Sequence, residues 1–88
     1  MPRLQKEVII KNPQGLHARP AALFVQTATK YNSEVTLQKG KEKVNGKSIM
    51  GILTIGAQKD CKLILTVDGD DAEQVMQELE QLLTRDEI

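Results

Sequence analysis

The chain has 88 residues, which is enough for one domain with a small hydrophobic core, and its 12 basic and 12 acidic side chains cancel. A neutral chain with one tyrosine and one phenylalanine lacks both the positive field and the aromatic surface on which nucleic-acid binding depends, so we expect no nucleic-acid partner. The single cysteine, Cys61, cannot form an internal disulfide, and residues 1–3 are followed by neither an apolar signal core nor a span of about 18 apolar residues. We therefore expect one cytoplasmic domain over residues 1–88, with no insertion in a membrane.

The first element is a predicted strand over residues 5–11. Its central residues Val8, Ile9 and Ile10 form a continuous apolar run. Such a run is typical of a strand that is covered on both sides, so we expect this strand to lie inside the sheet rather than at its edge.

A helix is predicted after this strand, with an end near residues 31–32. Four apolar residues recur at helical spacing in this segment: Ala18, Ala22, Val25 and Ala28. Pro20 fits only the first turn of a helix, where its missing N–H removes no hydrogen bond, so the helix begins at His17 or Ala18. Gly15 supplies the conformational freedom that a tight turn needs. The only histidine of the chain therefore lies where a strand turns into a helix.

The middle of the chain predicts a hairpin and a short helix. Residues 34–38 and 42–44 have the pattern of two strands joined by a turn. Asn45 and Gly46 end the second strand, and Ser48 is well placed to cap a short helix. The apolar residues of that helix outnumber what one buried face requires, so some must be exposed; they are Ile49, Met50, Ile52, Leu53 and Ile55.

The last third predicts a strand over residues 62–68, a turn over 68–70 and a final helix. This helix carries a regular apolar stripe of Ala72, Val75, Met76, Leu79, Leu82 and Leu83. Cys61 is a turn residue in this scheme, and the alternative of a reactive thiol has no second cysteine or nearby histidine to support it. The order βαββαβα favours an α+β fold, a two-layer sandwich whose helices cover one face of an antiparallel sheet. The order of the strands is not determined by this pattern.

The residues around His17 form a candidate phosphate site. Free N–H groups and the positive end of the helix dipole lie beside the imidazole, and Arg19 adds a planar fork of donors that suits phosphate oxygens. A neutral imidazole nitrogen can attack a phosphoryl group without a separate base. The chain shows no P-loop and no paired acidic metal site, so it is equipped to carry a phosphoryl group rather than to release it to water. The alternative is a histidine that only caps the helix or faces solvent.

Two motifs connect this chemistry to a family. Residues 15–21, GLHARPA, resemble the active-site signature of HPr, the phosphocarrier of the bacterial phosphoenolpyruvate:sugar phosphotransferase system. Residues 47–53, KSIMGIL, resemble the regulatory-serine segment of HPr proteins from Gram-positive bacteria, and they follow His17 by about thirty residues, as that family requires. The resemblance covers essentially the whole chain.

The resemblance implies a four-stranded antiparallel sheet in the order 1-4-2-3 with three helices on one face, the short second helix lying beside the start of the first. It also implies that enzyme I, charged by phosphoenolpyruvate, phosphorylates His17 on Nδ1 and that sugar-specific enzyme IIA domains accept the group. Arg19 is the implied phosphate-stabilising partner. No metal or cofactor is implied. A transient phosphohistidine makes such a protein a carrier in sugar transport rather than an enzyme, and we expect a monomer.

The same resemblance implies a partner-binding surface. The matching positions are Gln14, Ala18, Ala22, Leu23, Gln26, Thr29, Ile49, Met50, Gly51 and Leu53. Ala22 departs from the threonine common in the family, which removes a hydroxyl but leaves the His-Arg core of the motif intact. Gly51 has two interpretations: it permits close approach of a partner backbone, or it only weakens its helix, by about 0.5–1 kcal/mol relative to alanine.

Ser48 has two compatible interpretations, a helix cap and a phosphorylation site. The family resemblance implies modification by an ATP-dependent HPr kinase/phosphorylase. A phosphate would add about −1.5 to −2 charge to an apolar docking surface and change the choice of partner, as in carbon catabolite repression.

Two alternatives to the carrier follow from other features of the chain. Residues 21–26, AALFVQ, resemble Crh, an HPr paralogue, which implies a regulatory module that acts through phosphorylated Ser48 as corepressor of a catabolite-control regulator. Crh-like proteins lack the active-site histidine, whereas this chain keeps it. A phosphopantetheine carrier that uses Ser48 is the other alternative, and the strand signals argue against it because that class is helical.

Overall fold

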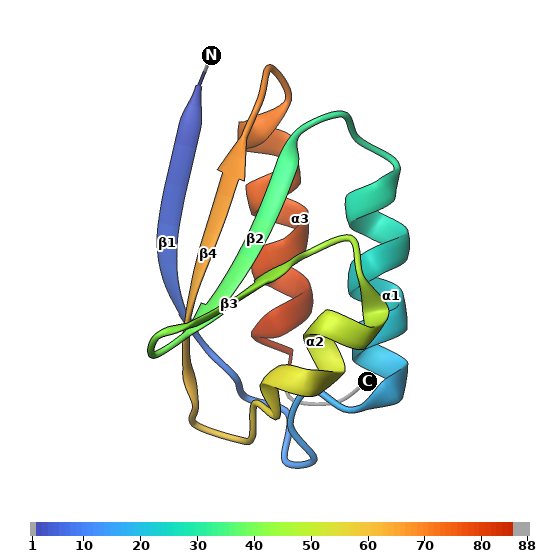
Figure 1. The fold of residues 1–88 in the computed structure, drawn as a ribbon, viewed down its shortest axis with the longest axis vertical. Helices are drawn as coiled ribbons and strands as arrows, with labels where there is room; N and C mark the ends of the chain where they lie inside the picture. The colour runs from blue at the N-terminus through green and yellow to red at the C-terminus, as the bar shows by residue number, and fades with distance from the viewer. Residues whose placement is uncertain (1, 86–88) are drawn as a thin grey trace.

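The computed structural model describes residues 2–85. Within this range four strands and three helices follow one another as β1 (Arg3–Ile9), α1 (Ala18–Thr29), β2 (Glu34–Lys39), β3 (Glu42–Asn45), α2 (Ile49–Ile55), β4 (Lys62–Asp68) and α3 (Ala72–Leu83). The strands form one antiparallel sheet in the order β1-β4-β2-β3, and the helices lie on one of its faces (Figure 1). The predicted βαββαβα sandwich and the strand order implied by the family resemblance are both confirmed. Between residues 2 and 85, no helix has the length and apolar character to cross a membrane.

Strand β4 and helix α3 supply much of the core. Along β4 the alternate side chains Leu63, Leu65 and Val67 are buried, while those between them are only half-buried. Helix α3 packs against β1 and β4, and its buried residues are Ala72, Val75, Met76, Leu79, Leu82 and Leu83. These are the six residues of the predicted stripe, which is therefore confirmed in full, because an amphipathic helix on a sheet buries its single apolar face.

The prediction that the first strand lies inside the sheet is wrong. Among the described residues 2–85, β1 is an edge strand that pairs with β4 alone. Val8 and Ile10 are buried, but Ile9 between them is 38% exposed. The apolar run spans the end of the strand: after Ile9 the chain leaves the ladder, and the N–H of Ile10 donates to the carbonyl of Cys61 at 3.0 Å. The three apolar residues in a row therefore do not show that β1 is covered on both faces. Val8 and Ile10 are buried and Ile9 between them is not, which is the ordinary alternation of a strand.

The buried face of α1 also differs from the predicted stripe. Its buried residues are Pro20, Ala21, Phe24 and Ala28. Of the other predicted positions, Ala22 and Val25 are half-buried and Ala18 is exposed. Residues 21–25 are all apolar, so they cover more than one face of the helix, and spacing alone does not choose between these faces. The core takes the face that carries Phe24, the largest fully buried side chain.

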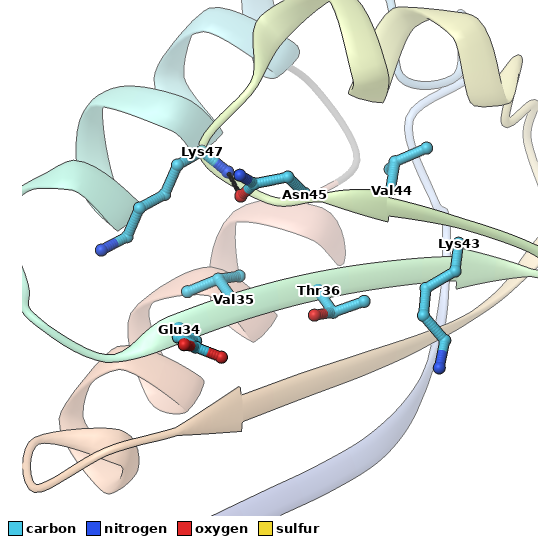
Figure 2. Close-up of a pocket in the computed structure, with 7 residues that line it drawn as sticks. All are labelled: Glu34, Val35, Thr36, Lys43, Val44, Asn45 and Lys47. Carbon is cyan, nitrogen blue, oxygen red and sulfur yellow. Dashed lines mark hydrogen bonds between the residues drawn. The ribbon is translucent and has the colours of Figure 1, made fainter.

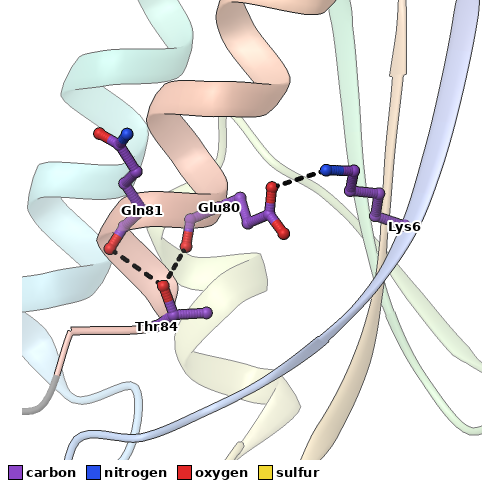
Figure 3. A network of polar contacts seen from close by, with 4 residues as sticks. All are labelled: Lys6, Glu80, Gln81 and Thr84. Carbon is purple, nitrogen blue, oxygen red and sulfur yellow. Dashed lines mark hydrogen bonds and ion pairs between the residues drawn. The ribbon is translucent and has the colours of Figure 1, made fainter.

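An ion pair joins the sheet to the helical layer at the surface. Lys6 on β1 donates to Glu80 on α3 at 2.9 Å, and the hydroxyl of Thr84 donates to the carbonyl of Glu80 at 2.9 Å (Figure 3). The side chains of Lys6 and Glu80 are 54% and 36% exposed. An ion pair this exposed contributes little to stability, so the packing of α3 rests on its apolar stripe.

A second polar contact connects the segment after α1 to the start of α3. The carboxylate of Asp71 accepts hydrogen bonds from the buried hydroxyl of Ser33 and from the N–H of Asn32, the latter at 3.2 Å. The Ser33 hydrogen bond holds the pKa of Asp71 below its ordinary value, because it stabilises the ionised carboxylate.

Candidate active site

His17 is the residue from which α1 starts. Its backbone is extended, with φ −85° and ψ −168°, and its carbonyl accepts a hydrogen bond from the N–H of Ala21 at 3.0 Å. This geometry makes His17 the N-cap and confirms the predicted helix start. The imidazole itself makes no capping hydrogen bond. The side chain is therefore not occupied in stabilising the helix.

The two nitrogens of the His17 ring have different surroundings. The residue as a whole is half-buried. Its Nε2 atom is enclosed and finds no hydrogen-bond partner among residues 2–85. The other ring nitrogen, Nδ1, is not among the enclosed atoms without a partner.

Close backbone contacts hold the loop that precedes His17. The N–H of Leu16 donates to the carbonyl of Ala57 at 2.9 Å, which ties this loop to the segment after α2. Gly15 has φ +71°, and a Cβ atom at this position would lie 2.5 Å from the Ala57 oxygen and 2.9 Å from the Cα of Gln58. Both the conformation and the space at position 15 therefore require glycine.

The start of α1 carries an excess of positive charge. Its first turn contains no acidic side chain. Arg19 in this turn is exposed and forms no ion pair within residues 2–85. The guanidinium adds to the positive end of the helix dipole and to the free N–H groups that every helix start has. An anionic group that approaches the imidazole here meets both the Arg19 guanidinium and the free backbone N–H groups.

Ser48 is the N-cap of α2, as predicted. Its Oγ accepts a hydrogen bond from the N–H of Gly51 at 3.1 Å. At the other end of α2, Gly56 adopts a left-handed conformation with φ +64°, and the ammonium group of Lys39 lies 3.4 Å from the carbonyl of Ile55. Both ends of this seven-residue helix are thus held, which it needs because so short a helix is unstable alone.

Three apolar side chains of α2 are exposed to solvent. The exposed fractions of Ile49, Met50 and Leu53 are 39%, 70% and 38%, and we call these three residues the docking patch. Ile52 and Ile55 of the same helix are buried, so the prediction that the helix buries only part of its apolar surface is confirmed. Helix α2 packs against α1 near the end where α1 begins (Figure 1). The docking patch and His17 therefore lie at the same end of the fold.

The other residues of the expected partner surface lie on the loop before His17, on α1 and on α2. All are accessible: Gln14, Ala18, Gln26 and Thr29 are exposed, and Ala22, Leu23 and Gly51 are half-buried. The hydroxyl of Thr29 donates to the carbonyl of Gln26 at 3.2 Å. Their contact with partner proteins stays a prediction.

Three residues that the sequence patterns did not single out support this site. They are Asn12 in the loop before His17, Ala57 after α2, and Lys39 at the end of β2. Only Asn12 had a local signal, since the dipeptide of Asn12 and Pro13 is typical of a turn. Ala57 and Lys39 act on segments that are distant in sequence, so no local pattern could identify them.

A shallow groove between β2 and β3 is separate from this site. Its volume is about 440 Å³, and its lining residues are Glu34, Val35, Thr36, Lys43, Val44, Asn45 and Lys47 (Figure 2). Neither His17 nor Ser48 lines it. Its charged lining residues are two lysines and one glutamate.

Comparison with known proteins matches both the fold and the motifs. The family model described as "PTS HPr component phosphorylation site" matches residues 4–85. The HPr-like protein Crh from Halalkalibacterium halodurans is 41% identical over 76 residues, covering 86% of this chain and 90% of that protein. The crystal structure of the phosphocarrier protein HPr from Bacillus anthracis superposes with a TM-score of 0.90 at 36% identity, covering 96% of this chain and all of that one. An HPr dimer from Thermoanaerobacter tengcongensis is 49% identical, with a TM-score of 0.71 over 85% and 86% of the two chains.

An open-faced sandwich with a half-buried histidine where α1 starts is, together with these matches, typical of small phosphocarrier proteins. The chain belongs to the HPr family of the phosphotransferase system, and it is also similar to Crh, which in Bacillus subtilis is described as the catabolite repression HPr.

Proposed function

We propose that the protein accepts a phosphoryl group on His17 and passes it to a second protein during carbohydrate uptake. Phosphorylated enzyme I is the donor in this scheme, and sugar-specific enzyme IIA domains are the acceptors. One observation carries the proposal: a half-buried imidazole with one enclosed nitrogen lies at a helix start whose first turn has no acidic side chain.

The enclosure of Nε2 supports Nδ1 as the nucleophile. The lone pair of Nδ1 forms a bond to phosphorus while the bond from phosphorus to the donor breaks, and the donor keeps that electron pair. This step transfers no proton. The acceptor then attacks the phosphorus in the same way, and the imidazole leaves with the electron pair of the P–N bond, which regenerates the carrier.

Arg19 and the start of α1 are proposed to hold the phosphoryl group on the ring. A guanidinium can donate to two phosphate oxygens at once, and the free N–H groups of Ala18 and Arg19 lie at the same helix end. These donors act by position and charge, which is the main contribution of proteins to phosphoryl transfer. The docking patch and the accessible residues of α1 would receive both partner proteins in turn.

Ser48 gives a second candidate function, in regulation. Its Oγ is at a helix N-terminus, where a phosphate is tolerated, and it directly precedes the docking patch. The 41% identity to a Crh protein favours this role for the present chain. We propose that an HPr kinase/phosphorylase modifies Ser48, and that the modified protein binds a catabolite-control regulator.

The carrier role is tested by incubation with phosphoenolpyruvate and enzyme I, followed by intact-mass spectrometry. We expect one added phosphoryl group that acid removes and alkali does not, which is the behaviour of a phosphohistidine. His17→Ala should gain none, whereas Ser48→Ala should gain one. If the parent protein gains none, the carrier proposal is overturned, and incubation with ATP and an HPr kinase/phosphorylase then tests the regulatory module on Ser48.

We further propose that the protein acts as a monomer in the cytoplasm. One copy of the chain can supply both the β1–β4 pairing and the whole core, so the fold does not require a second copy. The alternative is a dimer, as in the HPr dimer from Thermoanaerobacter tengcongensis. Sedimentation at micromolar concentration checks the proposal, and a dimer mass would contradict it.

A further inference from the structure

Two asparagines form the same turn at two places in the chain. The Oδ1 atom of Asn12 accepts a hydrogen bond from the N–H of Gln14 at 3.0 Å, and its carbonyl accepts from the N–H of Gly15 at 2.9 Å. The Oδ1 atom of Asn45 accepts from the N–H of Lys47 at 2.8 Å (Figure 2), and its carbonyl accepts from the N–H of Ser48 at 3.1 Å. The first turn precedes His17 and the second precedes Ser48. Each candidate phosphorylation site thus follows an asparagine turn.

The two turns differ in burial. Asn45 is exposed, whereas Asn12 is only 6% exposed. Asn12 lines a cavity of about 10 Å³ together with Leu16 and Pro20, and with Leu82 and Leu83 at the end of α3. The side chain of Asn12 is therefore fixed between the loop and the helical layer.

The burial of Asn12 is unfavourable for stability alone. Its Nδ2 atom is enclosed and has no hydrogen-bond partner within residues 2–85. A buried donor without a partner destabilises a fold, and the turn itself needs only the oxygen, as the exposed Asn45 shows. Residues that destabilise the fold in this way are typical of functional sites.

The Asn12 turn lies directly before the two residues Leu16 and His17. Gly15, whose N–H donates to the carbonyl of Asn12 and closes the turn, has a left-handed conformation, and the N–H of the next residue, Leu16, donates to the carbonyl of Ala57. His17 follows directly as the helix N-cap. A change in the turn therefore moves the backbone from which the imidazole projects.

We propose that Asn12 is a positioning residue for phosphoryl transfer, which holds the loop so that Nδ1 of His17 meets the phosphorus in line. This inference rests on the proposed role of His17. Transfer needs the reacting atoms about 3–3.5 Å apart with aligned orbitals, and a displacement of about 1 Å can slow such a step about 100-fold. The docking patch lies on α2 and takes no part in the Asn12 turn. Of the expected partner surface only Gln14 belongs to this turn, so loss of Asn12 should slow the chemical step far more than it weakens the binding of the donor.

The test measures phosphoryl transfer from phosphorylated enzyme I in a rapid-quench experiment over a range of donor concentrations. Asn12→Ala should lower the rate constant at saturating donor about 10- to 100-fold and leave the half-saturating concentration within about threefold. Asn12→Ser should recover part of the rate, since a serine hydroxyl makes the same turn more weakly. Asn45→Ala is the matched control, because it removes an equivalent turn but should keep the saturating rate within about twofold of the parent.

The outcomes of this experiment test the positioning role of Asn12 separately from the carrier function. The positioning role is overturned if Asn12→Ala transfers at the parental rate, if it raises only the half-saturating concentration, or if Asn45→Ala slows transfer equally. Circular dichroism verifies that the variants fold, and if Asn12→Ala does not, a parental rate in Asn12→Ser overturns the proposal. A parent protein that accepts no phosphoryl group disproves the carrier function itself, whereas an active parent with unaffected Asn12 variants disproves only the positioning role.

Discussion

Replacement of Gly15 by alanine should destabilise the protein through two separable effects. The first is conformational: φ at this position is +71°, and a left-handed conformation costs a residue with a Cβ about 1–2 kcal/mol. The second is steric, because the new Cβ would lie 2.5 Å from the carbonyl oxygen of Ala57. Relief of this overlap requires the loop to move away from Ala57. The hydrogen bond from Leu16 to that oxygen is then lost, at a further cost of about 0.5–1.5 kcal/mol.

Gly40 provides the matched control for this substitution. Its φ is +60°, but a Cβ there would have no neighbour within 4 Å. Gly40→Ala should therefore cost only the conformational term of about 1–2 kcal/mol, whereas Gly15→Ala should cost about 1.5–3.5 kcal/mol. For a domain of this size, 1 kcal/mol lowers the melting temperature by about 4–8 °C.

Thermal unfolding and amide hydrogen exchange distinguish the two effects. We expect Gly15→Ala to melt several degrees below Gly40→Ala and the N–H of Leu16 to exchange faster only in Gly15→Ala. Equal melting temperatures, together with an unchanged exchange rate at Leu16, would show that the loop accommodates a Cβ without leaving Ala57 and would refute this reasoning.

Four further predictions follow from the site and the fold. His17→Ala should abolish phosphate acceptance in the mass-spectrometric assay while the melting temperature changes little, since a half-exposed ring supports few core contacts; carriage by this variant would place the nucleophile elsewhere. Arg19→Lys keeps the charge but loses the two-pronged donor, so transfer to enzyme IIA should slow with little change in stability, and unchanged quench-flow kinetics would remove Arg19 from the mechanism. Ser48→Asp can still cap α2 but puts a carboxylate beside the docking patch, which should raise the half-saturating concentration of enzyme I about tenfold or more; full recovery at moderate salt would contradict this desolvation account. Because the folded pKa of Asp71 is lowered, its contribution to stability is present above its unfolded pKa and is lost as the pH falls through the folded value; Ser33→Ala should flatten this acid dependence in denaturant titrations, and an unchanged slope would show that the hydrogen bond does not matter.

Local sequence patterns predicted those parts of the fold whose cause is itself local. All six residues of the stripe predicted for α3 are buried, because a single face of this helix packs on a single face of the sheet. The cap at Ser48 was predictable because donor and acceptor are three residues apart. The strand of residues 62–68 was bounded correctly by the turns on either side of it.

The parts that sequence did not predict depend on neighbours far along the chain. The apolar run at Ile9 could not reveal an edge strand, because only the place of β4 in the sheet decides which strands lie at the edges. The buried face of α1 depends on which of its apolar residues meets the core, and Phe24 does. The burial of Asn12 depends on Leu82 and Leu83, which follow it by about seventy residues.

The position of β4 has a consequence for how the protein is made. β4 pairs with both β1 and β2, so it is the strand that joins the sheet together, yet it begins only at Lys62. At a synthesis rate of about 5–20 residues per second, β1 waits roughly 3–12 s for its partner while a ribosome extends the chain. Until β4 emerges, only the β2–β3 hairpin and the local helical turns can form. The nascent chain therefore exposes the future core over most of its synthesis, and the sheet closes in one late step that brings the two ends of the sequence together.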